Sequence, residues 1–205
     1  MMQIYVMKIE TIELDDLVDV LGLTKGTIPT QIKPANDRRR LDDIFMSYLA
    51  ATSKGDIVEI GTSYGRGTCI LASNTSHTVH TINPLPEHHT GQITLNMTKK
   101  DIGKYYIDLG LKNICQYYGS SIDWKYEGSP PNFCFIDGCH DKKYAYLDGV
   151  MCEKILSDGG WIAWHDFDPN SKEYWVREVV AGVRQWADGR KIYHLKLRSL
   201  ESLII

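Results

Sequence analysis

The sequence lacks the features that mark exported, membrane-spanning or nucleic-acid-binding proteins. No apolar run approaches the roughly 18 residues of a spanning helix, and the N-terminus has no apolar core followed by a small-residue cleavage site. The chain of 205 residues carries 23 basic and 26 acidic side chains, and its net charge of −3 provides no basic surface for nucleic acid or anionic lipid. We therefore expect a cytoplasmic protein without membrane or nucleic-acid partners.

The cysteines form neither a disulfide framework nor a metal-binding pattern. There are five of them, an odd number, and no two are spaced as a C-x-x-C pair. Three of the five lie inside apolar runs, where a buried thiol behaves as a small apolar side chain. A chain of 205 residues can also bury roughly 70% of its unfolded surface, so its stability requires neither disulfides nor a metal. A reducing compartment fits this composition.

The sequence does contain a regular alternation of short apolar strands and amphipathic helices. The expected strands cover residues 57–60, 78–82, 113–118, 133–136 and 160–164. Apolar residues recur at helical spacing between them. In the helix that starts near residue 142, the residues expected to point inward are Tyr144, Leu147, Met151 and Ile155. Alternating units of this kind predict a three-layer, doubly wound α/β fold with a mostly parallel sheet.

Both ends of the chain depart from this alternation. Residues 191–205 hold two strand-like runs that are close enough to pair as a C-terminal antiparallel hairpin at the end of the sheet. Residues 1–36 hold a short helix and a proline-containing stretch, which we interpret as a helical or lid segment ahead of a main domain at 37–205. Apolar residues of the first segment can pack on the domain or on a second copy, so a homodimer is one expectation.

The loop after the first expected strand has the composition of a ligand cradle. Residues 59–67 read Glu-Ile-Gly-Thr-Ser-Tyr-Gly-Arg-Gly, in which glycines allow the backbone to approach a ligand and a helix N-terminus follows. The loop lacks the G-x-G-x-x-G dinucleotide fingerprint and the Gly-Lys-Ser/Thr ending of a P-loop. These absences disfavour nicotinamide dinucleotides and nucleoside triphosphates and indicate a different nucleoside cofactor.

Two later segments place polar residues directly after strands, where open α/β sheets bind their ligands. Residues 135–141 read Phe-Ile-Asp-Gly-Cys-His-Asp, and residues 159–167 read Gly-Gly-Trp-Ile-Ala-Trp-His-Asp-Phe. Together with Glu-x-Gly-x-x-x-Gly at 59–65, they resemble the class I S-adenosylmethionine-dependent methyltransferases, in particular the small-molecule O-methyltransferases related to macrolide and sugar enzymes. The resemblance covers residues 37–205. It implies an enzyme that methylates a hydroxyl group of a small acceptor, a sugar or a natural product.

The resemblance also implies which residues hold S-adenosylmethionine. The implied cofactor-binding residues are Glu59, Gly61, Thr62, Ser63, Gly65, Asn83, Ser120 and Asp137. Two of these positions depart from the family pattern. Asn83 stands where an acidic residue usually holds the ribose hydroxyls, and Ser120 stands near where an aspartate commonly lies beside the adenine. The amide of Asn83 can still form a hydrogen bond, but it lacks the charged acceptor of a carboxylate.

A metal site follows from the same resemblance, and a base follows from the chemistry of methyl transfer. Residues Asp137, His165 and Asp166 match the positions that bind a divalent ion in metal-dependent members. Two carboxylates suit Mg²⁺ or Mn²⁺, whereas an imidazole shifts the preference toward Mn²⁺, Fe²⁺ or Zn²⁺. These residues therefore do not decide which ion is bound. Methyl transfer requires removal of the acceptor's hydroxyl proton, and His140, with an ordinary pKa of about 6.5, is the expected base. Asp137 is the second residue expected to act in catalysis.

Two other functions remain open on the residues alone. His140 and His165 with one aspartate could form a two-histidine, one-carboxylate site for Fe²⁺ and its oxygen or hydrolytic chemistry. Alternatively, Asn83 and Ser120 are consistent with a protein that keeps the fold and binds a nucleoside or metabolite without turning it over.

Overall fold

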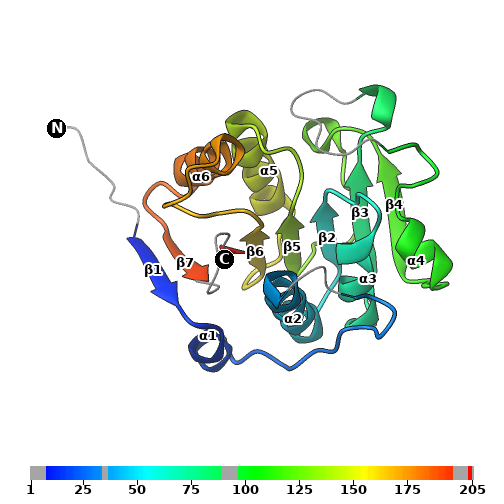
Figure 1. Ribbon diagram of the computed structural model, residues 1–205, viewed down its shortest axis with the longest axis horizontal. Coiled ribbons are helices and arrows are strands. Elements are labelled where there is room, and N and C mark those ends of the chain that lie inside the picture. Colours follow the sequence, from blue (N-terminus) through cyan, green and yellow to red (C-terminus); the bar gives the residue numbers. More distant parts are fainter. Residues whose placement is uncertain (1–7, 34–36, 89–96, 196–202, 205) are drawn as a thin grey trace.

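A computed structural model (Figure 1) describes residues 8–33, 37–88, 97–195 and 203–204 of the chain. A single sheet of 8 strands forms the centre, in the spatial order β1-β7-β8-β6-β5-β2-β3-β4. Helices α5 and α6 cover one face of the sheet, and α1, α2 and α3 cover the other. This arrangement confirms the predicted three-layer α/β fold.

The strands and helices follow one another along most of the chain. The strands are β1 (Lys8–Ile12), β2 (Ile57–Ile60), β3 (Val79–Asn83), β4 (Ile114–Tyr118), β5 (Phe133–Ile136), β6 (Trp161–Trp164), β7 (Lys191–Leu195) and β8 (Leu203–Ile204). The helices are α1 (Leu14–Leu21), α2 (Asp37–Thr52), α3 (Arg66–Ser73), α4 (Lys104–Asp108), α5 (Lys142–Ile155) and α6 (Tyr174–Trp186). Two short 3₁₀ turns complete the set, η1 (Pro86–His88) and η2 (Ser121–Asp123). The five strands predicted in the middle of the chain are confirmed within one residue.

The middle of the sheet is parallel, and its register brings the ends of the strands to one edge. Strands β6, β5, β2, β3 and β4 are neighbours in that order. Ile60, the last residue of β2, pairs with Ile82 of β3 and with Ile136 of β5. Ile136 in turn pairs with Trp164, the last residue of β6. The residues that follow these strands therefore lie side by side, which is where ligands bind in open parallel sheets.

At the end of the sheet formed by β1, β7 and β8, the order of the strands differs from the prediction. Strand β8 is antiparallel to β7, but it lies between β7 and β6, so the hairpin predicted at the end of the sheet is not confirmed. The connection at 196–202 falls outside the described residues. The pair is not at the end of the sheet, because β1 adds in parallel to β7 and forms the outer edge. No local signal predicted β1, since its partner lies about 180 residues away along the chain, and non-local pairing leaves no mark in a short window.

Each face of the sheet packs its own apolar core. Ile57 of β2 packs with α2 and α3, whereas its neighbour Val58 packs with α5 and α6, as expected for alternating side chains of a strand. Full burial on both faces explains why β2 and β5 are continuous apolar runs apart from Glu59. Within the described residues, none of the helices combines the length and the apolar character needed to cross a bilayer.

The residues that helix α5 buries differ from the predicted inward-facing residues Tyr144, Leu147, Met151 and Ile155. The fully buried residues are Ala145, Asp148, Gly149 and Cys152. A Cβ atom on Gly149 would lie 2.7 Å from the Trp164 ring and 2.9 Å from the Trp186 ring. Small residues occupy the contact because α5 approaches α6 and β6 closely, and the larger residues of the predicted stripe lie at its margin.

Candidate functional site

The loop between β2 and α3 is held in a conformation that requires glycine. Gly61 has φ of +101°, and a Cβ atom there would lie 2.0 Å from the carbonyl oxygen of Asp137. Gly65 has φ of +82° and packs against the backbone of Gly103. Between them, Ser63 also adopts a positive φ of +49°, which is uncommon for a residue with a side chain. The loop therefore turns sharply and delivers the chain into the N-terminus of α3.

Glu59 lies under this loop as a buried carboxyl group. Its side chain is 1% exposed, and its Oε2 accepts hydrogen bonds from the hydroxyls of Thr68, at 2.5 Å, and Thr81, at 2.6 Å. Burial raises the pKa of Glu59 to about 8, although the two hydroxyls act in the opposite direction. A Cβ atom on Gly67 would lie 2.6 Å from Oε1, so the start of α3 closes over the carboxyl group.

Asn83 braces the loop at the end of β3. Its Oδ1 accepts a hydrogen bond from the backbone N–H of Ser63 at 3.0 Å, and its Nδ2 donates to the carbonyl oxygen of Pro84 at 2.8 Å. The backbone N–H of Gly119 donates to the carbonyl oxygen of Asn83 at 3.1 Å, which joins the ends of β3 and β4. The asparagine thus has a structural task that a sequence motif could not reveal.

Two other predicted cofactor residues also make internal contacts. The hydroxyls of Thr62 and Thr81 lie 2.7 Å apart, so Thr62 is tied to the group around Glu59. Ser120 caps η2, where its Oγ accepts from the backbone N–H of Ile122 at 3.4 Å. Thr62 lies in the glycine loop after β2, and Ser120 lies just after the end of β4.

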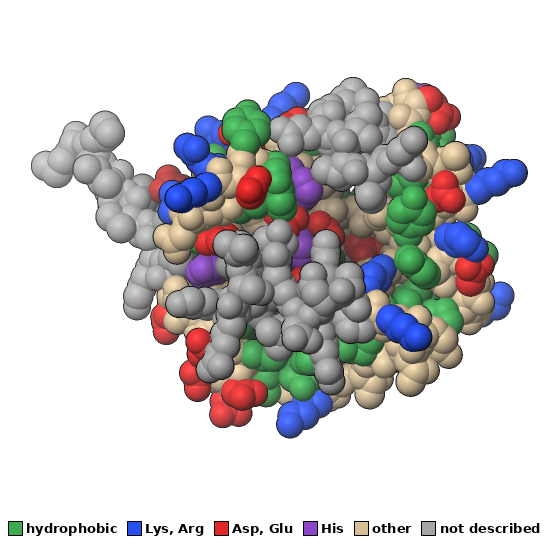
Figure 2. All heavy atoms as spheres, viewed as in Figure 1, with side chains coloured by type: hydrophobic (Ala, Val, Ile, Leu, Met, Phe, Trp, Pro, Cys, Tyr) green, Lys and Arg blue, Asp and Glu red, His purple; other side chains and the backbone are tan. Residues whose placement is uncertain are grey.

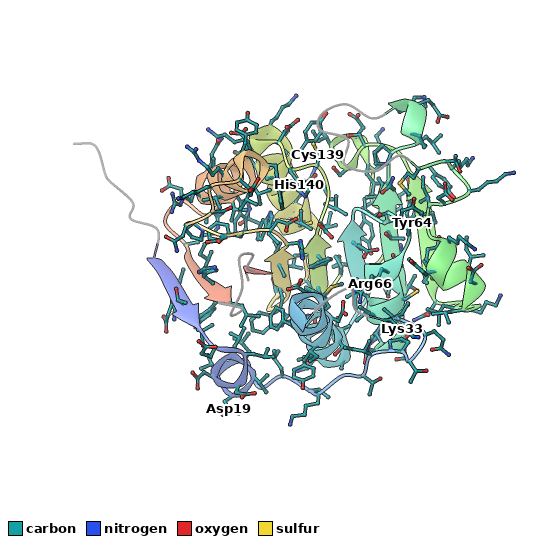
Figure 3. All side chains as sticks on the ribbon, viewed as in Figure 1. Asp19, Lys33, Tyr64, Arg66, Cys139 and His140 are labelled. Atoms are coloured by element: carbon teal, nitrogen blue, oxygen red, sulfur yellow. The ribbon has the colours of Figure 1, made fainter. Side chains whose placement is uncertain are left out.

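A second group of side chains lies across the ends of β5 and β6. Asp137, His140 and Asp166 each present one ligand atom, and these atoms lie within 4.8 Å of one another. His140 Nε2 is 3.1 Å from Asp166 Oδ2, and the Trp175 ring lies 4.8 Å from the His140 ring, centre to centre. Asp166 has a positive φ of +59°, so the backbone turns sharply where this carboxylate begins the loop. Figure 3 shows His140 on the side of α5 and Arg66 on the side of α2.

His165, one of the predicted metal ligands, contacts both of the others, Asp137 and Asp166. The compact group of ligand atoms within 4.8 Å contains His140 together with the same two aspartates. His165 is 4% exposed, with Nε2 3.3 Å from Asp42 Oδ2 and Nδ1 2.9 Å from Asp166 Oδ1. Asp137 Oδ1 lies 3.6 Å from the same Nδ1. Both ring nitrogens of His165 thus face carboxylates, and the group of three described above contains one histidine, His140.

The charges in this group shift one another's pKa values strongly. Burial would lower the pKa of His165, but the carboxylates of Asp137 and Asp166, and hydrogen bonds to Asp166 and Asp42, outweigh it and raise the pKa well above its usual value. Burial would also lower the pKa of His140. The net effect is still a raised pKa, mainly because His140 forms a hydrogen bond with Asp166. Burial alone would raise the pKa of Asp166, yet the two histidines hold it well below its usual range. The group is a compact set of paired charges.

Helix α2 contributes two acids that sequence reasoning missed. Asp42 contacts His165, and its neighbour Asp43 forms a two-pronged ion pair with the guanidinium group of Arg66 at the start of α3. Both acids are almost fully buried. The only signal in the sequence is a pair of adjacent acids between Leu41 and Ile44 of an amphipathic helix. Adjacent acids are equally common on the solvent-exposed faces of helices. Figure 2 shows acidic and histidine side chains gathered in a hollow on this face of the molecule.

A glycine loop and a group of acids and histidines, both at the ends of parallel strands, define a ligand-binding α/β enzyme. A profile of the methyltransferase-domain family matches residues 58–167, more than half of the chain, so the chain belongs to that family. The matched segment begins in β2 and ends directly after Asp166, and it therefore contains both halves of the site.

Solved structures of methyltransferases share the fold. An O-methyltransferase from Bacillus cereus in complex with S-adenosylhomocysteine is 19% identical, with a TM-score of 0.57 over 93% of this chain and 88% of that one. A Podospora anserina methyltransferase bound to S-adenosylhomocysteine is 16% identical, with a TM-score of 0.60 over 93% and 92%. A Streptomyces achromogenes O-methyltransferase of tomaymycin synthesis, in complex with S-adenosylmethionine, is 13% identical, with a TM-score of 0.59 over 93% and 92%. A comparison with curated protein sequences gives no match.

Proposed function

We propose that this chain transfers the methyl group of S-adenosylmethionine to a hydroxyl group of a small acceptor. The observation that carries the proposal is the contact between the two halves of the site, where the backbone of Gly61 lies directly against Asp137. A cradle for a nucleoside cofactor thus adjoins a histidine that can accept a proton. When bound, S-adenosylmethionine would supply a methyl group on a positively charged sulfur.

The loop residues fit the cofactor by shape and by charge. Gly61 and Gly65 let the loop pack closely against the backbone of Asp137 and of Gly103, which gives the cradle its shape. Glu59, Thr62, Ser63, Asn83 and Ser120 would surround the same cradle from the strand ends. The buried carboxyl of Glu59 would favour a ligand with a positive charge, because such a charge would stabilise its ionised form.

His140 would accept the proton of the acceptor hydroxyl. Asp166 engages Nε2 at 3.1 Å and so favours the tautomer with its proton there, which leaves Nδ1 as the basic nitrogen. The Trp175 ring restricts the imidazole from the other side. An aspartate that orients a histidine and stabilises its protonated form is a general device for proton removal. Asp137, whose side chain is 34% exposed, lies beside this pair and can position the acceptor hydroxyl.

A divalent cation is an alternative to His140 as the base, because an imidazole that binds an ion cannot also accept the hydroxyl proton. Asp137, His140 and Asp166 offer two carboxylates and an imidazole close enough to share one ion. They would hold Mn²⁺ or Fe²⁺ more readily than Mg²⁺, since an imidazole is among the ligands. The ion would lower the pKa of an acceptor hydroxyl and neutralise the alkoxide. The acceptor, a sugar or another hydroxylated metabolite, follows from the family resemblance alone.

Isothermal titration with S-adenosylmethionine and S-adenosylhomocysteine tests the proposal first. The titrations are made in chelator and then with Mg²⁺, Mn²⁺ or Fe²⁺, and saturable one-to-one binding is expected. A panel of sugars and hydroxylated natural products is then screened for production of S-adenosylhomocysteine. Absence of binding under every condition would overturn the proposed function, and binding without turnover on a broad panel would favour a protein that only binds the nucleoside.

A pair of histidine variants locates the base. His140→Asn should keep the affinity for S-adenosylhomocysteine and lower turnover roughly 100-fold or more, in line with the usual contribution of a general base. His77→Asn is the matched control, because His77 precedes β3 at the opposite end of the strands. Equal turnover in the two variants would exclude His140 as the base.

A further inference from the structure

Four side chains form a continuous line of alternating acids and imidazoles across the site. Asp42 Oδ2 lies 3.3 Å from Nε2 of His165, and Nδ1 of the same ring lies 2.9 Å from Oδ1 of Asp166. The other oxygen of Asp166 lies 3.1 Å from Nε2 of His140. The line starts on α2, passes the end of β6 and finishes in the loop after β5. It therefore ties a helix on one face of the sheet to the proposed base beside the other.

Burial makes this line rigid. The side chains of Asp42, His165 and Asp166 are 6%, 4% and 7% exposed, and that of His140 is 17% exposed. A buried charge without a partner costs several kcal/mol, so each of these groups is held where its neighbour can pair with it. Moving Asp42 would leave Nε2 of His165 without the carboxylate that it faces, and moving Asp166 would remove the carboxylate between the two imidazoles. The orientation at one end thus depends on the contact at the other.

We propose that Asp42 is a positioning residue that sets the orientation of His140 through His165 and Asp166. Asp42 does not reach the acceptor or the cofactor cradle by any contact in the described structure. It fixes the ring of His165, which fixes the carboxylate that holds Nε2 of His140. The role in methyl transfer rests on the proposed function, whereas the coupling between Asp42 and His140 is a property of the protein alone.

The adjacent acid on the same helix provides a matched control. Asp43 is as buried as Asp42, but it pairs with Arg66 and is not part of the line. Asp43→Asn therefore removes a buried carboxylate from α2 without touching His165. Asp42→Asn keeps an oxygen that can accept the Nε2–H of His165, and Asp42→Ala removes it. The three variants separate a general loss of charge on α2 from the loss of this particular contact.

Imidazole nitrogen NMR on the full chain measures the coupling directly, at one pH and in chelator. His140→Asn and His165→Asn assign the signals. We expect Asp42→Ala to remove the slowly exchanging Nε2–H signal of His165 and to shift both ring nitrogens of His140 by several linewidths. Asp42→Asn should give a smaller shift, and Asp43→Asn should leave the His140 signals in place. His140 signals that are equal in Asp42→Ala and Asp43→Asn would overturn the proposal.

Kinetics then separates positioning from folding. With an acceptor found in the screen, Asp42→Ala should lower kcat roughly 10- to 100-fold, because small misplacements of a catalytic group are costly. The affinity for S-adenosylhomocysteine should stay within about threefold, and Asp42→Asn should recover part of kcat. Loss of kcat in proportion to a lower Tm, shared by Asp43→Asn, would show a merely structural role. A wild-type chain that fails to bind S-adenosylhomocysteine would refute the proposed function, while the NMR result still decides the coupling.

Discussion

The two halves of the site hold carboxyl groups of the same chemistry in opposite states. Glu59 is buried among hydroxyls, with no positive partner among the residues that the structure describes, and its pKa is raised to about 8. Asp166 is nearly as buried, but two histidines flank it and its pKa is lowered. The cofactor half is thus specified by shape and backbone conformation, and the other half by paired charges. The first should be sensitive to added atoms, and the second to removed charges.

The largest expected effect comes from adding one carbon atom to the cofactor half. Gly61→Ala would place Cβ 2.0 Å from a backbone oxygen at a φ of +101°. We expect a loss of about 4 kcal/mol or more in the free energy of unfolding, measured by urea denaturation. Gly110→Ala is the control, since its φ of +67° is also positive but no atom lies within 4 Å of the new Cβ. A similar cost for both would mean that the close approach to Asp137 is unimportant.

Removing one charge from the other half should have the next largest effect. Asp166→Asn leaves the buried rings of His140 and His165 without their shared carboxylate. The expected loss is about 3 kcal/mol at neutral pH, because breaking a buried ion pair leaves an uncompensated charge. Glu59→Gln serves as the comparison, since it removes a buried acid that has no cationic partner among the described residues. A larger loss in Glu59→Gln than in Asp166→Asn would reverse the contrast between the two halves.

The pH dependence of stability should show the state of Glu59. Its pKa rises from 4.5 to about 8 on folding, so the folded chain binds this proton more tightly than the unfolded chain. Its contribution is therefore complete below pH 4.5 and is lost as the pH rises toward 8. Relative to Glu59→Gln, the wild type should lose roughly 2 kcal/mol between about pH 6 and pH 7.5. Parallel stability curves for the two proteins would contradict the raised pKa.

The smallest expected effect is a gain in cofactor affinity. In Asn83→Asp, one carboxylate oxygen can keep the hydrogen bond from Ser63 while the other accepts from a ribose hydroxyl. The bond from Asn83 to Pro84 is lost, so the expected net gain is only about 1 kcal/mol, or roughly fivefold in the Kd of S-adenosylhomocysteine. Asn83→Ala should weaken binding, because the brace of the loop is removed. Weaker binding in Asn83→Asp would show that the amide is needed as a donor.

Local patterns predicted the parts of the fold that are local. The buried strands β2 and β5 and the turn at Gly61 leave short, strong signals in the sequence. Strand β1 and the place of β8 do not, since both depend on partners far along the chain. In the candidate site, the positions after β2, β5 and β6 were predicted from the strand ends. The contact of His165 with Asp42 was not, because Asp42 reaches the site from a helix and lies 123 residues from His165 along the chain.

The order of the strands in the sheet also determines when each strand can pair during synthesis. Strand β1 is made first, but its partner β7 joins the parallel strands only through β8, which is made last. During synthesis, the central strands can pair as they emerge, while the first strand must wait for nearly the whole chain. Long waits of this kind expose unpaired strand edges. Strand β1 therefore depends on two strands, β7 and β8, that are synthesised long after it.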